Sequence, residues 1–89
     1  MRHRYLEVTF RRGKPLAAYL YLPRASGAKA ARTTDEGHGL RVDYDTDGAP
    51  MGIEITAPSA AEIEHVNAVL TKLGQPELAP EEWAPAKAA

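Results

Sequence analysis

Two periodicities divide this sequence, and their order constrains the fold more than any other feature. From residue 5 to residue 55, apolar and polar side chains alternate in short runs separated by turns that contain glycine or proline. Such alternation is typical of half-buried β-strands. After Pro58 the apolar residues recur at helical spacing. The order predicts an α+β domain, with an antiparallel sheet followed by one helix.

The alternating runs predict strands joined as hairpins. Asp47-Gly48 is a strong signal for a tight turn between two of them, and Gly13 with Pro15 punctuates another. We expect a curved antiparallel sheet of four or five strands, a meander of hairpins, with the helix packed on its aliphatic face. The predicted strands are Tyr5–Phe10, Leu16–Leu22, Ala30–Thr34, Leu40–Tyr44 and Met51–Ile55.

The helical period predicts a helix over Ser59–Leu73. Ser59 and Glu62 match the Ser-x-x-Glu pattern of a capping box, in which the two side chains satisfy free backbone N–H groups of the first turn. Gly74 is suited to a left-handed C-cap, and Pro76 prevents the helix from continuing. We therefore expect one domain over residues 1–74 and a proline-containing tail over residues 75–89. Pro80 is suited to start a short helical turn in that tail.

Composition excludes several classes of protein. The chain has 89 residues, enough for one domain, and no cysteine, which excludes disulfides and thiolate chemistry and suits a reducing compartment. No apolar run approaches the roughly 20 residues of a membrane span. Residues 1–10 alternate charged and apolar side chains, unlike the apolar core of a signal peptide. We therefore expect a cytoplasmic protein with no membrane contact.

Charge is segregated along the chain. Residues 1–41 hold nine basic and three acidic side chains, whereas residues 42–89 hold two basic and nine acidic ones. Such asymmetry can mark a nucleic-acid surface. The preferred interpretation is that basic and acidic strands lie side by side, because a nearly neutral chain lacks the long-range field that attracts phosphate.

One segment matches a calcium-binding pattern. Asp43, Asp45, Asp47, Gly48 and Glu54 reproduce the spacing of the EF-hand loop. That loop requires a helix on each side, and here both flanks alternate like strands. We therefore expect a hairpin with solvent-facing aspartates, and no metal site.

No catalytic or cofactor motif is visible. His3, His38 and His65 lie in three different kinds of segment and lack metal-ligand spacing. The sequence shows neither a Ser–His–Asp arrangement nor a glycine-rich phosphate loop that opens a helix. We therefore expect a protein that is not an enzyme and that carries no cofactor.

Aromatic residues are the candidates for binding a partner. Tyr19 and Tyr21, together with Tyr5, are expected on the sheet face that one helix cannot cover, and Trp83 is an anchor in the tail. Exposed tyrosines suit protein interfaces and can also stack on bases. Glu7 and Glu54 are expected on the same face and repel phosphate, which favours self-association over nucleic-acid binding.

Two stretches resemble a known family. Leu16–Leu22 resembles the strand A-L-Y-I-x-L of the short bacterial domain-of-unknown-function family 2283, and residues 42–55 look like its V-D-Y-D-x-x-G-x-x-x-G-I-E-I motif. The resemblance covers residues 4–57. It implies a small β-rich domain in which the acidic loop is a hairpin, and some members resemble antitoxin-like partners of small toxin-like proteins. The added helix and the Trp83 tail depart from the family.

These observations predict a non-catalytic protein-interaction module, homodimeric through the tyrosine-bearing face. The first alternative is an antitoxin-like partner of a small toxin-like protein. The second is nucleic-acid binding through a face of tyrosine and arginine.

Overall fold

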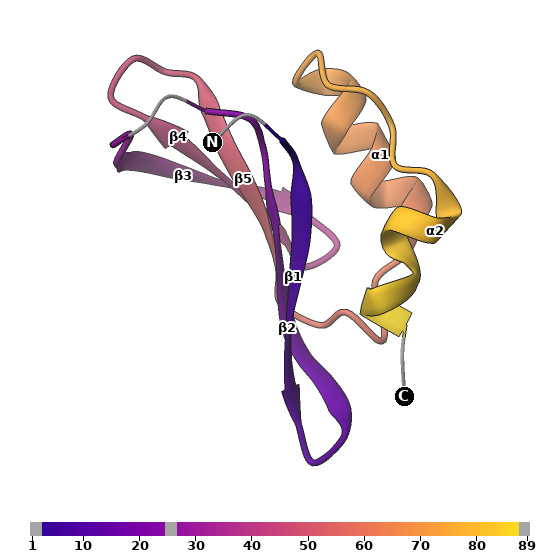
Figure 1. Cartoon of the computed structure of the whole chain (residues 1–89). Helices are drawn as coiled ribbons and strands as arrows, with labels where there is room; N and C mark the ends of the chain where they lie inside the picture. The colour runs from indigo at the N-terminus through magenta and orange to yellow at the C-terminus, as the bar shows by residue number, and fades with distance from the viewer. Residues whose placement is uncertain (1–2, 25–26, 88–89) are drawn as a thin grey trace.

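The computed structural model describes residues 3–24 and 27–87, and its main element is a five-stranded antiparallel sheet (Figure 1). The strands are β1 (Tyr5–Arg11), β2 (Lys14–Tyr21), β3 (Ala30–Gly37), β4 (Leu40–Asp45) and β5 (Pro50–Ile55), and the helical elements are α1 (Ile63–Lys72), α2 (Pro80–Trp83) and the 3-10 turn η1 (Ala84–Lys87). The predicted α+β fold is confirmed.

The sheet joins two units side by side. The β1–β2 hairpin forms one unit and the β3–β4–β5 meander forms the other, and β2 pairs with β5 between them. The order in space is β1-β2-β5-β4-β3, so β1 and β3 are the two edges. The chain therefore crosses from one half of the sheet to the far edge between β2 and β3.

Two hairpin turns have the same tight geometry. Arg12 and Gly13 have φ of 54° and 77°, and His38 and Gly39 have φ of 54° and 73°. Positive φ at both central residues defines a type I′ turn, whose twist matches the twist of the flanking strands. These turns fix the pairs Arg11–Lys14 and Gly37–Leu40 at the hairpin ends.

Both helices and the 3-10 turn cover the same face of the sheet, and no helix of the described residues lies on the other face (Figure 1). Because side chains alternate along each strand, the aliphatic residues of β2, β4 and β5 all point to the covered face. The buried core comprises Ala18, Leu20, Leu22, Leu40, Val42, Ile53, Ile55, Ala61, Val66, Val69, Leu70, Leu78, Trp83 and Ala86.

Helix α1 is shorter than the sequence pattern predicts. It begins at Ile63, with Glu62 as its N-cap and no side-chain cap bond, so the predicted capping box at Ser59 is wrong. Residues 57–61 form a separate turn in which the Ala57 carbonyl accepts from the N–H groups of Ala60 and Ala61. This turn and the burial of Pro58 hold the segment out of the helix.

The end of α1 follows the prediction closely. Gly74 has φ of 74°. Its N–H donates to the Thr71 carbonyl at 3.0 Å, and the Gln75 N–H donates to the Leu70 carbonyl at 2.8 Å. This pair of bonds is the Schellman motif, which satisfies two of the last carbonyls of a helix. Among the described residues, no helix has the length and apolar character needed to cross a membrane.

The C-terminal segment packs on the sheet as part of the domain up to Lys87, and the predicted start of a short helix at Pro80 is confirmed. Trp83 is 5% exposed and lies in the core. The Arg4 guanidinium donates to the carbonyls of Pro76 and Glu77, which ties this segment to the start of β1. Residues 88–89 of the predicted tail lie outside the described residues.

Candidate interaction surface

Three of the four predicted partner-binding residues meet on the helix-free face. Tyr5 pairs directly with Tyr21 across β1 and β2, and their rings stack with centroids 4.6 Å apart. The ring of Tyr19 lies 4.6 Å from that of Tyr21, tilted by 52°. We call Tyr5, Tyr19 and Tyr21 the tyrosine cluster. Trp83 is not part of it, because its ring is buried on the other side of the sheet.

Hydrogen bonds hold Tyr19 in a fixed position. Its hydroxyl donates to Asp43 Oδ2 at 2.7 Å, and the Thr33 hydroxyl donates to Asp43 Oδ1 at 2.6 Å. Burial and the hydrogen bond to the Asp43 carboxylate raise the pKa of the Tyr19 phenol. The phenol therefore stays a neutral donor well above the pH at which an ordinary tyrosine ionises.

Tyr21 is anchored on its other side. Its hydroxyl donates to Glu7 Oε1 at 3.3 Å, and the Arg24 guanidinium lies over its ring at 5.2 Å. Burial and the nearby Glu7 carboxylate raise the pKa of the Tyr21 phenol. Two of the three rings are thus held by hydrogen bonds, and side chains that are already ordered lose little conformational entropy when a partner binds them.

The helix-free face is acidic. The ladder register places Glu7, Glu54, Arg41 and Asp35 in one row across the sheet, next to Asp43 in the neighbouring row. Arg41 lies 3.9 Å from Glu54, so its charge is partly neutralised within the face. Carboxylates in this arrangement repel a phosphate backbone.

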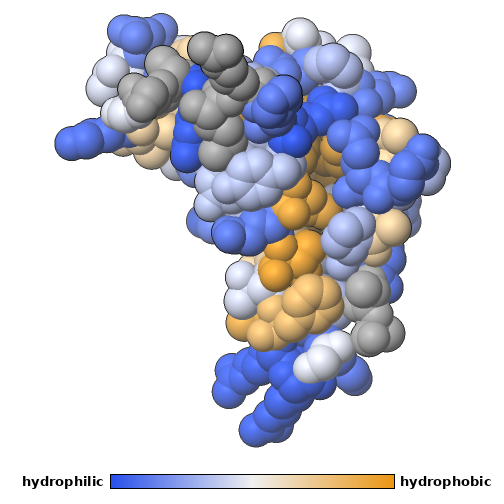
Figure 2. Space-filling model, viewed as in Figure 1, coloured by the Kyte–Doolittle hydropathy of each residue, from blue (hydrophilic) through white to orange (hydrophobic). Residues whose placement is uncertain are grey.

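The first hairpin also carries exposed apolar side chains on both of its faces. Among the described residues, the exposed large apolar side chains are Tyr5 at 46%, Phe10 at 47% and Leu16 at 51%, and all three lie on β1 and β2. Because β5 pairs only with Ala18–Tyr21 of β2, the distal half of the hairpin extends beyond the rest of the sheet (Figure 1). Figure 2 shows apolar surface running down the side of the molecule toward this hairpin, which ends in polar residues.

Phe10 and Leu16 were not among the predicted site residues. Their place in the alternation assigns them to the aliphatic face, together with Leu6 and Leu20. The helices cover only part of that face. Alternation predicts the face of the sheet to which a side chain points, but it does not predict whether a helix covers that side chain.

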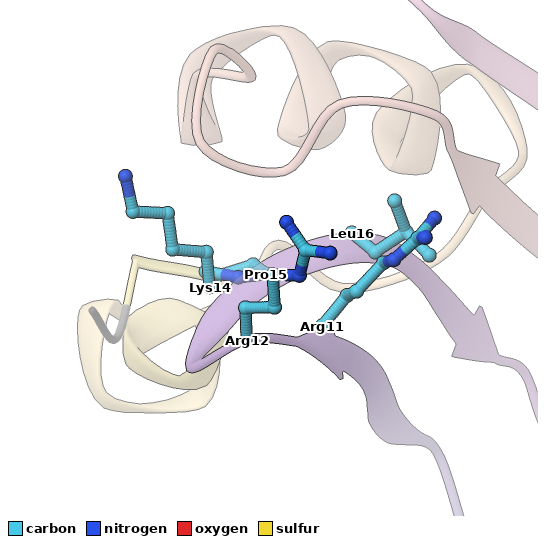
Figure 3. Close-up of a pocket in the computed structure, with 5 residues that line it drawn as sticks. All are labelled: Arg11, Arg12, Lys14, Pro15 and Leu16. Atoms are coloured by element: carbon cyan, nitrogen blue, oxygen red, sulfur yellow. The ribbon is translucent and has the colours of Figure 1, made fainter.

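The end of the hairpin is basic. Arg11, Arg12 and Lys14 line a shallow hollow of about 340 Å³ together with Pro15 and Leu16. Figure 3 shows the three basic side chains leaving the turn in different directions. They are therefore spread over the hairpin end and do not converge on one point.

The two edges of the sheet differ in regularity. On β3, residues Ala31 and Glu36 are extra residues at two irregularities, so this edge strand is bulged near both ends. On the other side the extra residue at the irregularity is Leu16 of β2, so β1 itself runs without an insertion. Bulges protect an edge from pairing with another strand. The β1 edge lacks that protection.

The segment that resembles a calcium loop is a hairpin, as predicted. Asp45 Oδ1 accepts from the N–H groups of Asp47 and Ala49 at 2.8 and 2.9 Å, which closes the turn between β4 and β5. Asp43 is engaged with Tyr19 and Thr33, on the ladder and away from this turn. In residues 3–24 and 27–87 no group of three or more potential metal ligands comes together.

Two histidines that are far apart in the sequence are in contact in the structure. The rings of His38 and His65 stack 3.6 Å apart beside a hollow of about 240 Å³ that Glu36 and Lys72 also line. Lys72 Nζ donates to Glu36 Oε1 at 2.8 Å, and the Thr34 hydroxyl donates to Glu36 Oε2 at 2.8 Å. These contacts lower the pKa of the Glu36 carboxyl, the Lys72 bond contributing most, and Glu36 raises the pKa of Lys72. Glu36 and Lys72, the acid and the base of this hollow, therefore form an ion pair with each other.

The chain was compared with family models, curated proteins and solved structures, and none of them matches it. The resemblance of residues 4–57 to family 2283 therefore stays a prediction.

Proposed function

We propose that this protein is a non-catalytic interaction module that self-associates through its first hairpin. One observation carries the proposal: every large apolar side chain that is exposed in the described part of the chain lies on β1 or β2. Exposed apolar residues gathered on one hairpin of a small domain are typical of a protein contact surface. Their burial in a complex removes this apolar area from water, which is the main driving force of association.

The neighbouring tyrosine cluster supports a protein partner. Tyr5 stacks on Tyr21 on the helix-free face and remains exposed at the edge strand, whereas Phe10 and Leu16 lie on the opposite face of the same hairpin. Tyrosine, phenylalanine and arginine are enriched in protein interfaces, and this hairpin presents all three. The lack of cysteine suits a reducing compartment, so cytoplasmic localisation is part of the proposal.

The two alternatives have less support. Nucleic-acid binding through the tyrosine face is disfavoured by Glu7, Asp43 and Glu54, which lie on that face. Binding to a small toxin-like protein rests on the family resemblance, and no feature of the surface favours it over self-association. A catalytic role is disfavoured because Glu36 and Lys72, the acid and the base of the hollow beside the stacked histidines, are hydrogen-bonded to each other.

Sedimentation velocity over a range of protein concentrations tests the proposal. We expect the wild-type chain to dimerise and the double variant Phe10→Ser with Leu16→Ser to remain monomeric, since it lacks the exposed apolar groups. Both side chains are exposed, so the variant should keep its circular dichroism spectrum. Ala68→Ser, at an exposed position of α1, is the matched control and should dimerise like the wild type. A wild type that stays monomeric at high concentration would refute self-association.

A further inference from the structure

The exposed edge strand suggests how two copies meet. Resting on the proposed function, we infer that the partner is a second copy of this chain and that the two β1 strands pair antiparallel about a twofold axis at Val8. The pairing joins two five-stranded sheets into one continuous sheet. The regular β1 edge permits this contact, whereas the bulges of β3 oppose it at the other edge.

Symmetry restricts the possible registers. In a twofold antiparallel pairing, one residue lies opposite its own copy and the residues on either side pair in mirror order. Val8 is the central residue of Tyr5–Arg11. A twofold axis at Val8 therefore pairs all seven strand residues, and any other axis pairs fewer of them.

On the covered face this register brings apolar groups together. Val8 meets Val8 of the second copy, and Leu6 meets Phe10 of the second copy. Leu6 borders a hollow of about 260 Å³ whose other apolar lining residues include Leu20 and Leu78, and whose charged lining residues are Arg4, Glu81 and Glu82. Phe10 is 47% exposed in the single chain and points to the same face as this hollow. The pairing thus covers an exposed ring and brings it to the apolar side of this hollow, twice per dimer.

On the helix-free face the same register pairs complementary polar groups. Tyr5 meets Arg11 of the second copy, which places a guanidinium beside the stacked rings of Tyr5 and Tyr21. Glu7 meets Thr9 of the second copy, so within the seven paired strand residues no like charges lie opposite each other.

The two neighbouring registers are less favourable, one because of charge repulsion and the other because of backbone conformation. An axis at Glu7 would place Glu7 opposite its own copy, and like charges directly opposite each other are destabilising. An axis at Thr9 would place Leu6 opposite Arg12, a turn residue with φ of 54° that cannot continue a ladder. Charge and backbone conformation therefore both favour the register with the twofold axis at Val8.

Cysteine cross-linking of the full chain tests the register, because the natural sequence has no cysteine. Single variants Glu7→Cys, Val8→Cys and Thr9→Cys are mixed with a mild oxidant and followed by non-reducing gel electrophoresis. Residues opposite each other have Cα atoms about 4.5–5.5 Å apart, within reach of a disulfide. With the axis at Val8, position 7 or 9 is offset from its own copy by two residues, about 7 Å along the strand, and lies out of reach. Ala31→Cys on β3 is the matched control at the other edge.

We expect rapid dimer formation by Val8→Cys and little by the other three variants. Faster cross-linking of Glu7→Cys or Thr9→Cys overturns the register. A wild type that dimerises in sedimentation while none of positions 7, 8 and 9 cross-links overturns the edge pairing and leaves self-association through the hairpin intact. A wild type that is monomeric refutes both.

A second pair of variants keeps the inference testable if Val8→Cys fails to fold. Phe10→Glu should raise the dimer dissociation constant at least about tenfold, since a charge replaces the ring that covers the hollow. Leu16→Glu changes an equally exposed side chain on β2, outside the paired strands, and should have the smaller effect. Equal effects of the two substitutions would contradict pairing along β1.

Discussion

The ring of Tyr19 lies across Gly52 so closely that a Cβ atom at residue 52 would come within 2.2 Å of Tyr19 Cε1. Gly52 is buried on β5, directly beneath the ring on the helix-free face. Gly52→Ala should therefore displace Tyr19 and strain its bond to Asp43. We expect a loss of about 1–3 kcal/mol of unfolding free energy, as for other overpacked sites, measured by urea denaturation.

A double-mutant cycle isolates this contact. In a Tyr19→Ala background the space above residue 52 is empty, so Gly52→Ala should cost little or even stabilise the strand, because alanine has less backbone freedom to lose than glycine. Equal costs of Gly52→Ala in both backgrounds would show that the ring is not what excludes a side chain.

The raised pKa of Tyr19 makes stability depend on alkaline pH. The folded chain holds this phenol neutral above the ordinary value of 10.0, so its contribution is fully present below pH 10.0. As the pH rises further the unfolded chain ionises first, and the contribution is lost. Tyr19→Phe should flatten the alkaline part of the stability profile and cost about 1–3 kcal/mol near neutral pH, because Asp43 loses a donor. Urea denaturation at a series of pH values measures both effects.

Alanine substitutions at the two ends of α1 should have different effects on the unfolding free energy. Ser59→Ala should change the unfolding free energy by less than about 0.5 kcal/mol, since Ser59 lies outside the helix and caps nothing. Gly74→Ala should cost about 1–2 kcal/mol, because φ of 74° is strained for any residue with a Cβ. A large loss for Ser59→Ala would restore the helix start that the sequence pattern suggests.

Trp83 should be essential for the fold of the whole domain. Its ring belongs to the same core as the sheet residues, so Trp83→Ala should cost about 3–5 kcal/mol, enough to unfold many domains of this size. Glu81→Ala, two residues earlier and exposed, is the control and should have little effect. Thermal unfolding followed by circular dichroism compares them. A Trp83→Ala variant as stable as the wild type would mean that the C-terminal segment is dispensable.

Acid should weaken the link between β3 and α1. The pKa of Glu36 is lowered below its ordinary value of 4.5, so its contribution to stability is present above pH 4.5 and is lost as the pH falls through the lower, folded value. Glu36→Gln should therefore reduce the loss of stability below pH 4.5. Glu64→Gln, at an exposed position of α1, is the control for replacing a carboxylate by an amide on this helix. Identical acid profiles for wild type and Glu36→Gln would rule out this contribution.

Much of the architecture follows from local pattern. The alternation of residues 5–55, the Asp47-Gly48 turn and the helical spacing after Pro58 each reflect a geometric period of the backbone, so they predict strands, a hairpin and a helix without tertiary information. The same alternation places Tyr5, Tyr19 and Tyr21 on the helix-free face. The Gly74 cap follows in the same way, because its requirement is local.

The order of strands, the start of α1 and the burial of Trp83 were decided by tertiary structure. Alternation does not say which strands become neighbours, so the pairing of β2 with β5 had no local signal. Ser59 fits the local sequence pattern of a helix N-cap, and such a cap would contribute about 1 kcal/mol to stability. The separate turn over residues 57–61 and the packing of Pro58 outweigh that contribution. Burial depends on which surfaces the fold brings together, and for this reason Trp83 lies in the core while Phe10 and Leu16, which share the aliphatic pattern, remain exposed.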